Sequence, residues 1–212
     1  MNEWSFILSY CKRKGKNTLA KRRGQKYEQI IEAAVKVIAQ NGYHHSQVSK
    51  IAKEAGVADG TIYLYFKNKE DILVSLFQEK MGKFIQKIED ELAGESSIEE
   101  KLLVLITMHL QQLQDDYSLA IVTQLELRQS NLELRNRINE VLKGYLKLID
   151  TVILLGIEEG IFSGDIDVRI ARQMIFGTID EVVTNWVMKE HKYNLVLQAK
   201  PVHTMLLKAL AK

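Results

Sequence analysis

The chain has 212 residues, which is long enough for one or two domains with a substantial core. Apolar residues make up 46% and charged residues 26%, a balance that excludes disorder of the whole chain. The single cysteine, Cys11, excludes an internal disulfide framework and a cysteine-rich zinc site, and it suits the reducing cytoplasm. The apolar runs, such as residues 102–106, are too short to span a membrane.

The charges are unevenly distributed along the chain. Residues 1–80 carry 14 Lys and Arg against 8 Asp and Glu, whereas the remainder carries 15 against 19, and the net charge is +2. The net positive charge of residues 1–80 suggests that this part binds a polyanion. The alternative is a chance imbalance together with a disordered basic arm. Residues 1–25 are interpreted as a flexible basic arm. They are not a secretory signal, since the cluster Lys12-Arg13-Lys14 follows the apolar residues instead of preceding them.

Helical spacing of apolar residues is found along the rest of the chain, and no stretch alternates as a strand would. Breakers and caps divide it: Asn41-Gly42 as a stop, and Ser46, Asn68, Ser97 (with Glu100) and Asp167 as N-caps. The predicted helices cover residues 27–40, 47–54, 58–65, 69–92, 97–113, 116–128, 131–160, 167–189 and 194–211. The sequence therefore predicts an all-α protein.

Residues 26–70 are predicted to form a three-helix DNA-binding domain with a helix-turn-helix, and residues 71–212 a helical bundle. Two short helices can cross closely only if small residues meet there, and Ala52, Ala55, Gly56 and Ala58 fit this need. An apolar seam would come from Val48, Ile51, Val57, Ile62 and Phe66. The outward positions of residues 59–67 would then face the major groove of DNA.

Residues 49–73 resemble the signature of the TetR family of bacterial repressors, and the likeness is dense over residues 27–73. The resemblance implies that Gly60 lets the backbone approach a phosphate, that Thr61 and Tyr63 contact phosphate or base edges, and that Lys69 meets a phosphate beside free helix amides. The full set of expected DNA-contacting residues is Ser46, Lys50, Gly60, Thr61, Tyr63, Leu64, Tyr65, Lys67 and Lys69.

Two positions in this segment leave alternatives open. Tyr65 could contact phosphate or belong to the core. Asp59 could accept a hydrogen bond from a cytosine amino group, but a carboxylate near phosphates is unfavourable, so the interpretation favours a cap of the helix 58–65.

Residues 119–135 and 167–187 resemble the branch of this family that regulates fatty acid degradation in bacilli. That likeness implies a long-chain acyl-CoA as effector, with no cofactor. An acyl tail needs a long apolar tunnel. The candidate lining residues are Leu105, Met108, Leu125, Leu146, Ile149, Met174, Phe176, Ile179, Val183 and Trp186. The alternative is that these side chains are ordinary bundle core.

The phosphates of a CoA head group would need cations at the tunnel mouth. Arg128, Arg135, Arg137, Lys143 and Lys147 are the candidates, unless they pair with nearby glutamates such as Glu126, Glu133 and Glu140. The last two helices are expected to form a homodimer interface, which would place two DNA-binding domains on a near-palindromic operator. The expected interface residues are Met174, Ile175, Ile179, Val182, Trp186, Leu206, Leu207 and Leu210.

The sequence therefore predicts a cytoplasmic, homodimeric repressor of fatty acid β-oxidation genes that binds double-stranded operator DNA and is released by long-chain acyl-CoA. A repressor that responds to another hydrophobic molecule or drug is the alternative. An enzyme is not expected, because the chain has no nucleophile elbow, glycine-rich phosphate loop or metal-binding His/Glu pattern. A purely structural helical oligomer is disfavoured by the helix-turn-helix motif.

Overall fold

The computed structural model describes residues 24–94 and 97–212, and these form α-helices joined by short connections. The helices are α2 (Gln25–His45), α3 (Val48–Glu54), α4 (Asp59–Tyr65), α5 (Lys69–Leu92), α6 (Ile98–Asp115), α7 (Tyr117–Glu126), α8 (Leu132–Glu158), α9 (Val168–Met188), the 3-10 helix η2 (Val196–Gln198) and α10 (Ala199–Leu210). The all-α expectation is confirmed. The expected arm lies outside the described residues except for Gly24 and Gln25, and Gln25 already begins α2.

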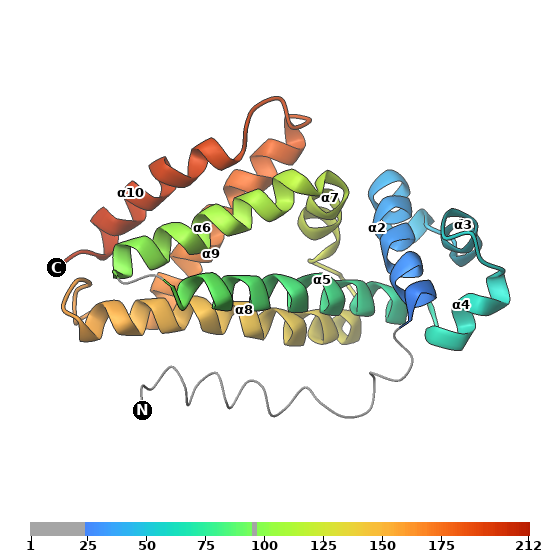
Figure 1. Ribbon diagram of the computed structural model, residues 1–212, viewed down its shortest axis with the longest axis horizontal. Coiled ribbons are helices and arrows are strands. Elements are labelled where there is room, and N and C mark those ends of the chain that lie inside the picture. The colour runs from blue at the N-terminus through green and yellow to red at the C-terminus, as the bar shows by residue number, and fades with distance from the viewer. Residues whose placement is uncertain (1–23, 95–96) are drawn as a thin grey trace.

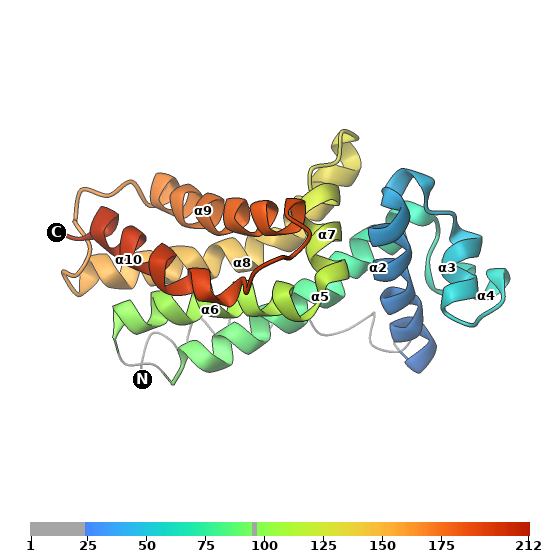
Figure 2. The same cartoon turned by 90° about the horizontal axis from the view of Figure 1, so that it is seen from above.

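The molecule is elongated, with α2, α3 and α4 at one end and the bundle of α5 to α10 at the other (Figures 1 and 2). We call α2–α4 the head. Helix α5 begins beside the head and runs the length of the bundle, with α8 packed along it. Helix α2 lies across α7, so the head contacts the bundle through both α5 and α7. The head is therefore mounted on the bundle by two helices.

Several helix ends fall where capping chemistry predicts them. The Asn68 side chain accepts a hydrogen bond from the Asp71 amide, and Asp167 accepts from the amides of Arg169 and Ile170. Ser97 and Glu100 form the expected reciprocal capping box. The expected helix over 194–211 begins later, with η2 before α10, and Pro201 occupies the first turn, where no intrahelical amide bond is lost.

The core of the head is the expected apolar seam. Ile51, Ile62 and Phe66 are fully buried, and Val48 and Val57 pack partly exposed against them. The buried methyl of Ala52 lets α3 lie close to its neighbours, and the turn that follows uses Gly56 at a positive φ of 66°. The backbone thus forms the tight helix-turn-helix that the sequence predicts.

The expected dimer residues divide into two groups. Ile175, Ile179, Trp186, Leu206 and Leu210 are buried in the chain's own bundle, so the expectation that these five form the homodimer interface is wrong. Met174, Val182 and Leu207 are only partly buried, and Ile170 and Met205 on the same two helices are exposed. The apolar surface that α9 and α10 offer to a partner therefore includes these last five side chains and the exposed Met188. Among the residues that the structure describes, no helix has the length and apolar character needed to cross a membrane.

Candidate DNA-binding surface and ligand cavity

The outer face of α4 presents a polar and aromatic surface at the far end of the head. The side chains of Tyr63 and Leu64 are 59% and 67% exposed, and Lys67 is exposed beside them. A Cβ placed on Gly60 would meet no heavy atom within 4 Å, so the backbone there is open to a close approach. Thr61 is half-buried at the same end of α4. These five residues, which we call the tip, lie together on one accessible surface.

Two further expected contacts lie at the edge of the tip. The ring of Tyr65 is half-buried, with its centroid 6.1 Å from that of Tyr27 on α2, so it packs inside the head while keeping one side accessible. Lys50 is exposed on α3 and donates to the side-chain oxygen of Asn41 at 3.2 Å. Neither residue belongs to the tip.

Ser46 does not belong to this surface. Its side chain is fully buried, and its hydroxyl donates to the carbonyls of Gly42 at 2.7 Å and Val37 at 3.1 Å. The expectations that Ser46 contacts DNA and caps the next helix are therefore wrong. It satisfies carbonyls near the end of α2, where Gly42 takes a φ of 73° and interrupts the helix.

Asp59 is not an N-cap. Ala58 occupies the N-cap position of α4, and Asp59 is the first helical residue, with an exposed side chain. A carboxylate in the first turn still interacts favourably with the positive end of the helix. The expected cap bond is absent because α4 begins at Asp59 itself, which leaves the N-cap position to Ala58.

Lys69 contacts the head itself. Its ammonium donates to the carbonyls of Tyr43 and His44, both at 3.0 Å, and lies 4.5 Å from the centre of the Tyr43 ring. An ammonium has three donors, so one remains for a phosphate. The lysine therefore joins the beginning of α5 to the end of α2 in the absence of DNA.

Further polar contacts hold the head on the bundle. The Tyr43 amide donates to Glu126 Oε1 of α7 at 2.8 Å. Within the bundle, Arg137 of α8 pairs at 2.9 Å with Asp71, in the first turn of α5. Burial, and then the carboxylates of Glu70 and Glu126, raise the pKa of the Tyr43 phenol to about 12, so this ring remains neutral.

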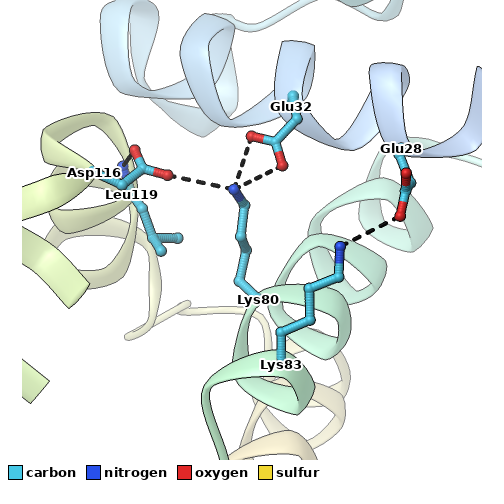
Figure 3. Close-up of polar contacts among 6 residues, drawn as sticks. All are labelled: Glu28, Glu32, Lys80, Lys83, Asp116 and Leu119. Atoms are coloured by element: carbon cyan, nitrogen blue, oxygen red, sulfur yellow. Dashed lines mark hydrogen bonds and ion pairs between the residues drawn. The ribbon is translucent and has the colours of Figure 1, made fainter. Parts of the chain in front are cut away.

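Two more contacts between α2 and the bundle start from lysines of α5 and are drawn in Figure 3. The ammonium of Lys80 lies 2.8 Å from Glu32 on α2 and 3.3 Å from Asp116, the N-cap residue of α7. Lys83 pairs with Glu28 on α2 at 3.3 Å. The two lysines thus tie one face of α2 to α5.

The bundle contains an apolar cavity that is partly open to solvent. Helices α5 to α9 contribute to its lining. The lining residues are Phe77, Lys80, Met81, Phe84, His109, Gln112, Leu113, Leu119, Thr123, Leu127, Leu142, Tyr145, Phe176 and Asp180.

The cavity wall carries one buried polar pair. His109 Nδ1 lies 2.7 Å from the hydroxyl of Tyr145, and both residues are buried. Burial lowers the pKa of His109 to about 4 against the opposing effect of Asp180, and burial raises the pKa of Tyr145. Both side chains are therefore neutral at neutral pH, which suits a site for an uncharged chain.

The structure gathers few of the expected tunnel residues at this cavity. Phe176 lines it, whereas Leu125 is 51% exposed on the surface of α7. The others lie in the core around the cavity, either buried or partly buried, without lining it: Leu105, Met108, Leu146, Ile149, Met174, Ile179, Val183 and Trp186. The expected residues come from α6 to α9, whereas α5 also supplies lining residues, among them Phe77, Met81 and Phe84.

None of the expected head-group cations lines the cavity, but Arg128 contacts the lining through its partner Asp180. Arg128 pairs with Asp180, Arg137 with Asp71, and Lys143 with Glu140 at 2.5 Å. Arg135 donates to the carbonyl of Gln129, and Lys147 is exposed on α8. The alternative of paired cations thus describes Arg128, Arg137 and Lys143, although the partners of the two arginines are aspartates.

Lys80, His109 and Tyr145 were not singled out from the sequence. A lysine and a histidine in an amphipathic helix are usually solvated, so nothing in their local pattern marked them. One available signal was the spacing of Lys80, Lys83 and Lys87, which places three cations on one face of α5.

A helix-turn-helix head with an open tip, mounted on a helical bundle with an apolar cavity, defines the class of helix-turn-helix transcriptional regulators. Within that class, the chain belongs to the TetR family of bacterial regulatory proteins. Residues 30–76 match the family model "Bacterial regulatory proteins, tetR family", and residues 77–209 match "YsiA-like protein, C-terminal region". Both the head and the bundle are covered.

Three relatives show how close the likeness is. The fatty acid metabolism regulator protein of Bacillus subtilis (strain 168) is 61% identical over 186 residues, which cover 88% of this chain and 96% of the relative. The solved structure of the fatty acid degradation regulator FadR from Bacillus halodurans is 64% identical with a TM-score of 0.85, covering 87% and 99% of the two chains. FadR from Bacillus subtilis in complex with stearoyl-CoA is 61% identical, with the same TM-score and the same coverage.

Proposed function

We propose that this protein is a cytoplasmic repressor of fatty acid degradation genes, which binds operator DNA as a homodimer and is released by long-chain acyl-CoA. The apolar cavity inside the bundle carries the proposal, because its lining suits an alkyl chain and includes α5, the helix that begins at the head. The relative that is 61% identical and was solved with stearoyl-CoA supports the choice of ligand.

The surface of the head supports the DNA-binding part of the proposal. Tyr63, Leu64 and Lys67 are exposed at the tip, and Gly60 is open. Two heads related by a two-fold axis would reach successive major grooves, about 34–36 Å apart. The partly exposed apolar side chains of α9 and α10 supply an interface for the second copy. The operator is accordingly a near-palindrome.

Release follows from linkage between the two sites. A ligand can lower DNA affinity only by binding the DNA-free form better than the DNA-bound form. A tenfold loss of DNA affinity needs about 1.4 kcal/mol of such coupling. That coupling has a physical route, since the helices that line the cavity include both supports of the head, α5 and α7.

A fluorescence anisotropy titration tests the proposal. Duplexes selected from a random library by the protein itself provide the operator, and stearoyl-CoA is then added below its micelle concentration. Dissociation by stearoyl-CoA but not by free CoA is the expected result. If the complex stays intact with saturating stearoyl-CoA, the assigned effector is wrong, and a thermal-shift screen of hydrophobic compounds tests the alternative of a drug-responsive repressor.

A further inference from the structure

The head carries little net positive charge for a part that binds DNA. Residues 24–67, from the start of α2 through the tip, contain five lysines against four Asp and Glu. Of these lysines, Lys36 pairs with Glu54, and Lys67 is the one at the tip. Neutralisation of phosphates by Lys and Arg supplies most of the sequence-independent affinity of a DNA-binding protein. The head by itself therefore offers few cations for this purpose.

Further cations lie directly before the head in the sequence. Residues 12–23, which we call the basic segment, contain no Asp or Glu and supply half of the 14 Lys and Arg of residues 1–80. The basic segment lies outside the described residues, and Gly24, the first residue of the described part, marks where it joins the head. Its cations are Lys12, Arg13, Lys14, Lys16, Lys21, Arg22 and Arg23.

The basic segment joins the head next to the tip. Tyr27, in the first turn of α2, stacks on Phe66 with the ring centroids 5.2 Å apart. The Tyr27 centroid is also 6.1 Å from that of Tyr65, the last residue of α4. In Figure 1 the start of α2 accordingly lies beside α4. The chain therefore enters the head where α4 ends, close to Lys67 of the tip.

The point of entry into α2 is open. Gly24 has an extended backbone, and its carbonyl accepts a hydrogen bond from the Tyr27 amide at 2.9 Å. Gly24, Gln25 and Lys26 are all exposed, and a Cβ placed on Gly24 would meet no heavy atom within 4 Å. No described residue therefore crowds the chain at the end of the basic segment, and a large partner such as a duplex can approach it.

Length and charge both favour DNA as that partner. Twelve residues span at most about 40 Å, whereas the minor groove is only about 6 Å wide, so the basic segment can cross one strand and reach the minor groove beside the half-site. Duplex DNA carries one negative charge per about 1.7 Å of its axis. The rest of the chain is a weaker competitor, because residues 81–212 contain 15 Lys and Arg against 19 Asp and Glu.

We propose that the basic segment binds the phosphates along the minor groove next to each operator half-site, and so extends the contact beyond the bases that the tip reaches. The proposal rests on the operator binding of the proposed function. The two basic segments of a homodimer contact the two flanks of the operator. Phosphates are the same in every sequence, so this contact adds affinity and salt dependence without adding sequence preference.

Charge variants of the full-length protein test the contact. The triple variant Lys21→Gln, Arg22→Gln, Arg23→Gln is compared with the wild type and with the control Lys192→Gln, Lys200→Gln, Lys212→Gln, which changes the net charge equally at exposed residues of the bundle. Fluorescence anisotropy measures affinity for the selected operator at several salt concentrations. Each lost phosphate contact lowers the slope of log affinity against log salt by about 0.9. The triple variant is expected to lose at least about two units of slope, and the control none.

Duplex length tests where the contact lies. The operator is prepared with and without flanks of about ten base pairs, one helical turn, on each side. At low salt, the wild type and the control are expected to bind the flanked duplex at least about tenfold more tightly than the trimmed one. The triple variant is expected to bind the two duplexes nearly equally, because its basic segments no longer attract the flanks.

The outcomes separate this inference from the proposed function. Equal salt slopes of the wild type and the triple variant would overturn the contact, and equal affinity of the wild type for both duplexes would overturn its position on the flanks. Tighter operator binding by the triple variant would mean that the basic segment pairs with the acidic bundle, which also overturns the inference. In each of these cases operator binding itself stands. Failure of the wild type to bind either duplex rejects the proposed function.

Discussion

The backbone amide of Tyr43 donates a 2.8 Å hydrogen bond to the carboxylate of Glu126, although the two residues are 83 positions apart. Tyr43 follows the interruption of α2 at Gly42, and Glu126 is the last residue of α7. The second oxygen of the carboxylate accepts from the Gln129 side chain, which holds it in place. One glutamate of the bundle therefore fixes the end of the longest helix of the head.

Replacing Glu126 by Ala is expected to destabilise the protein by about 1–3 kcal/mol, because the Tyr43 amide loses its acceptor in a largely buried position. The same change is expected to reduce the effect of stearoyl-CoA on DNA affinity, since one of the contacts that couple head and bundle is gone. Urea unfolding and anisotropy titrations measure the two effects.

Glu158→Ala serves as the control for that variant, because Glu158 is exposed at the end of α8 and makes no described hydrogen bond to the head. Equal stability of the Glu126 and Glu158 variants would contradict the structural role assigned to Glu126.

Replacing Gly60 by Ala is expected to affect folding and DNA binding in opposite directions. A methyl group there meets nothing within 4 Å, and alanine favours a helix over glycine by up to about 1 kcal/mol, so stability is kept or raised. The methyl would stand between the backbone and a phosphate, and operator affinity is expected to fall at least about tenfold.

Gly82→Ala is the matched control for Gly60→Ala, since Gly82 also lies in a helix with open space at its Cβ position. Undiminished operator binding by Gly60→Ala would show that the backbone at the tip does not approach DNA.

Substitutions at Tyr63 and at its neighbour Ile62 are expected to affect different properties, the first operator affinity and the second stability. Tyr63 is 59% exposed, so Tyr63→Ala should weaken operator binding while changing stability by about 0.5 kcal/mol or less. Ile62 is fully buried, and Ile62→Ala should cost about 2–5 kcal/mol. Thermal unfolding measures the stability of both variants. Fluorescence anisotropy at several salt concentrations measures their operator affinity. An operator affinity that does not fall with salt would argue against phosphate contacts at the tip.

Stability is expected to decrease below pH 6.5 because of His109. Burial lowers the pKa of this imidazole to about 4 in the folded protein, against an ordinary value of 6.5 in the unfolded chain. Between these values the unfolded chain binds a proton that the folded protein excludes, so the stabilisation is complete above pH 6.5 and is lost as the pH falls towards 4. The slope attributable to this site is at most about 1.4 kcal/mol per pH unit.

The pH effect is measured by urea unfolding at pH 7, 6 and 5. His109→Gln lacks the titrating group and is expected to lose less stability over the same range. An identical pH dependence in wild type and variant would show that the imidazole does not titrate in this way.

The head could be predicted from sequence because its determinants are local. Val48 and Ile51 are three residues apart in α3, and Ile62 and Phe66 are four apart at the end of α4. Asn68 lies where a cap is needed, so both the core and the start of α5 follow from a short segment. Ser46 was misassigned for a related reason. A serine before a helix usually caps it, but here the kink at Gly42 leaves carbonyls of α2 unpaired, and the hydroxyl bonds to them instead.

The cavity could not be predicted in the same way, because it depends on how five helices are rotated against one another. The apolar pattern selects the inward face of each helix, but not which inward side chain meets a gap and which meets another side chain. Phe176 faces the cavity, whereas Ile179, one turn later on α9, is packed in the core. Lys80 was missed because its partners Glu32 and Asp116 are distant in sequence.

The uninterrupted course of α5 has a mechanical consequence. Its 24 residues form a rod of about 36 Å, with Lys69 anchored in the head at one end and the cavity wall along its middle. A tilt of about 5° displaces one end of such a rod by about 3 Å relative to the other, close to the rise of about 3.4 Å between neighbouring base pairs. A rearrangement of side chains too small to alter the bundle's outline is thus amplified into a mismatch of one step along the double helix.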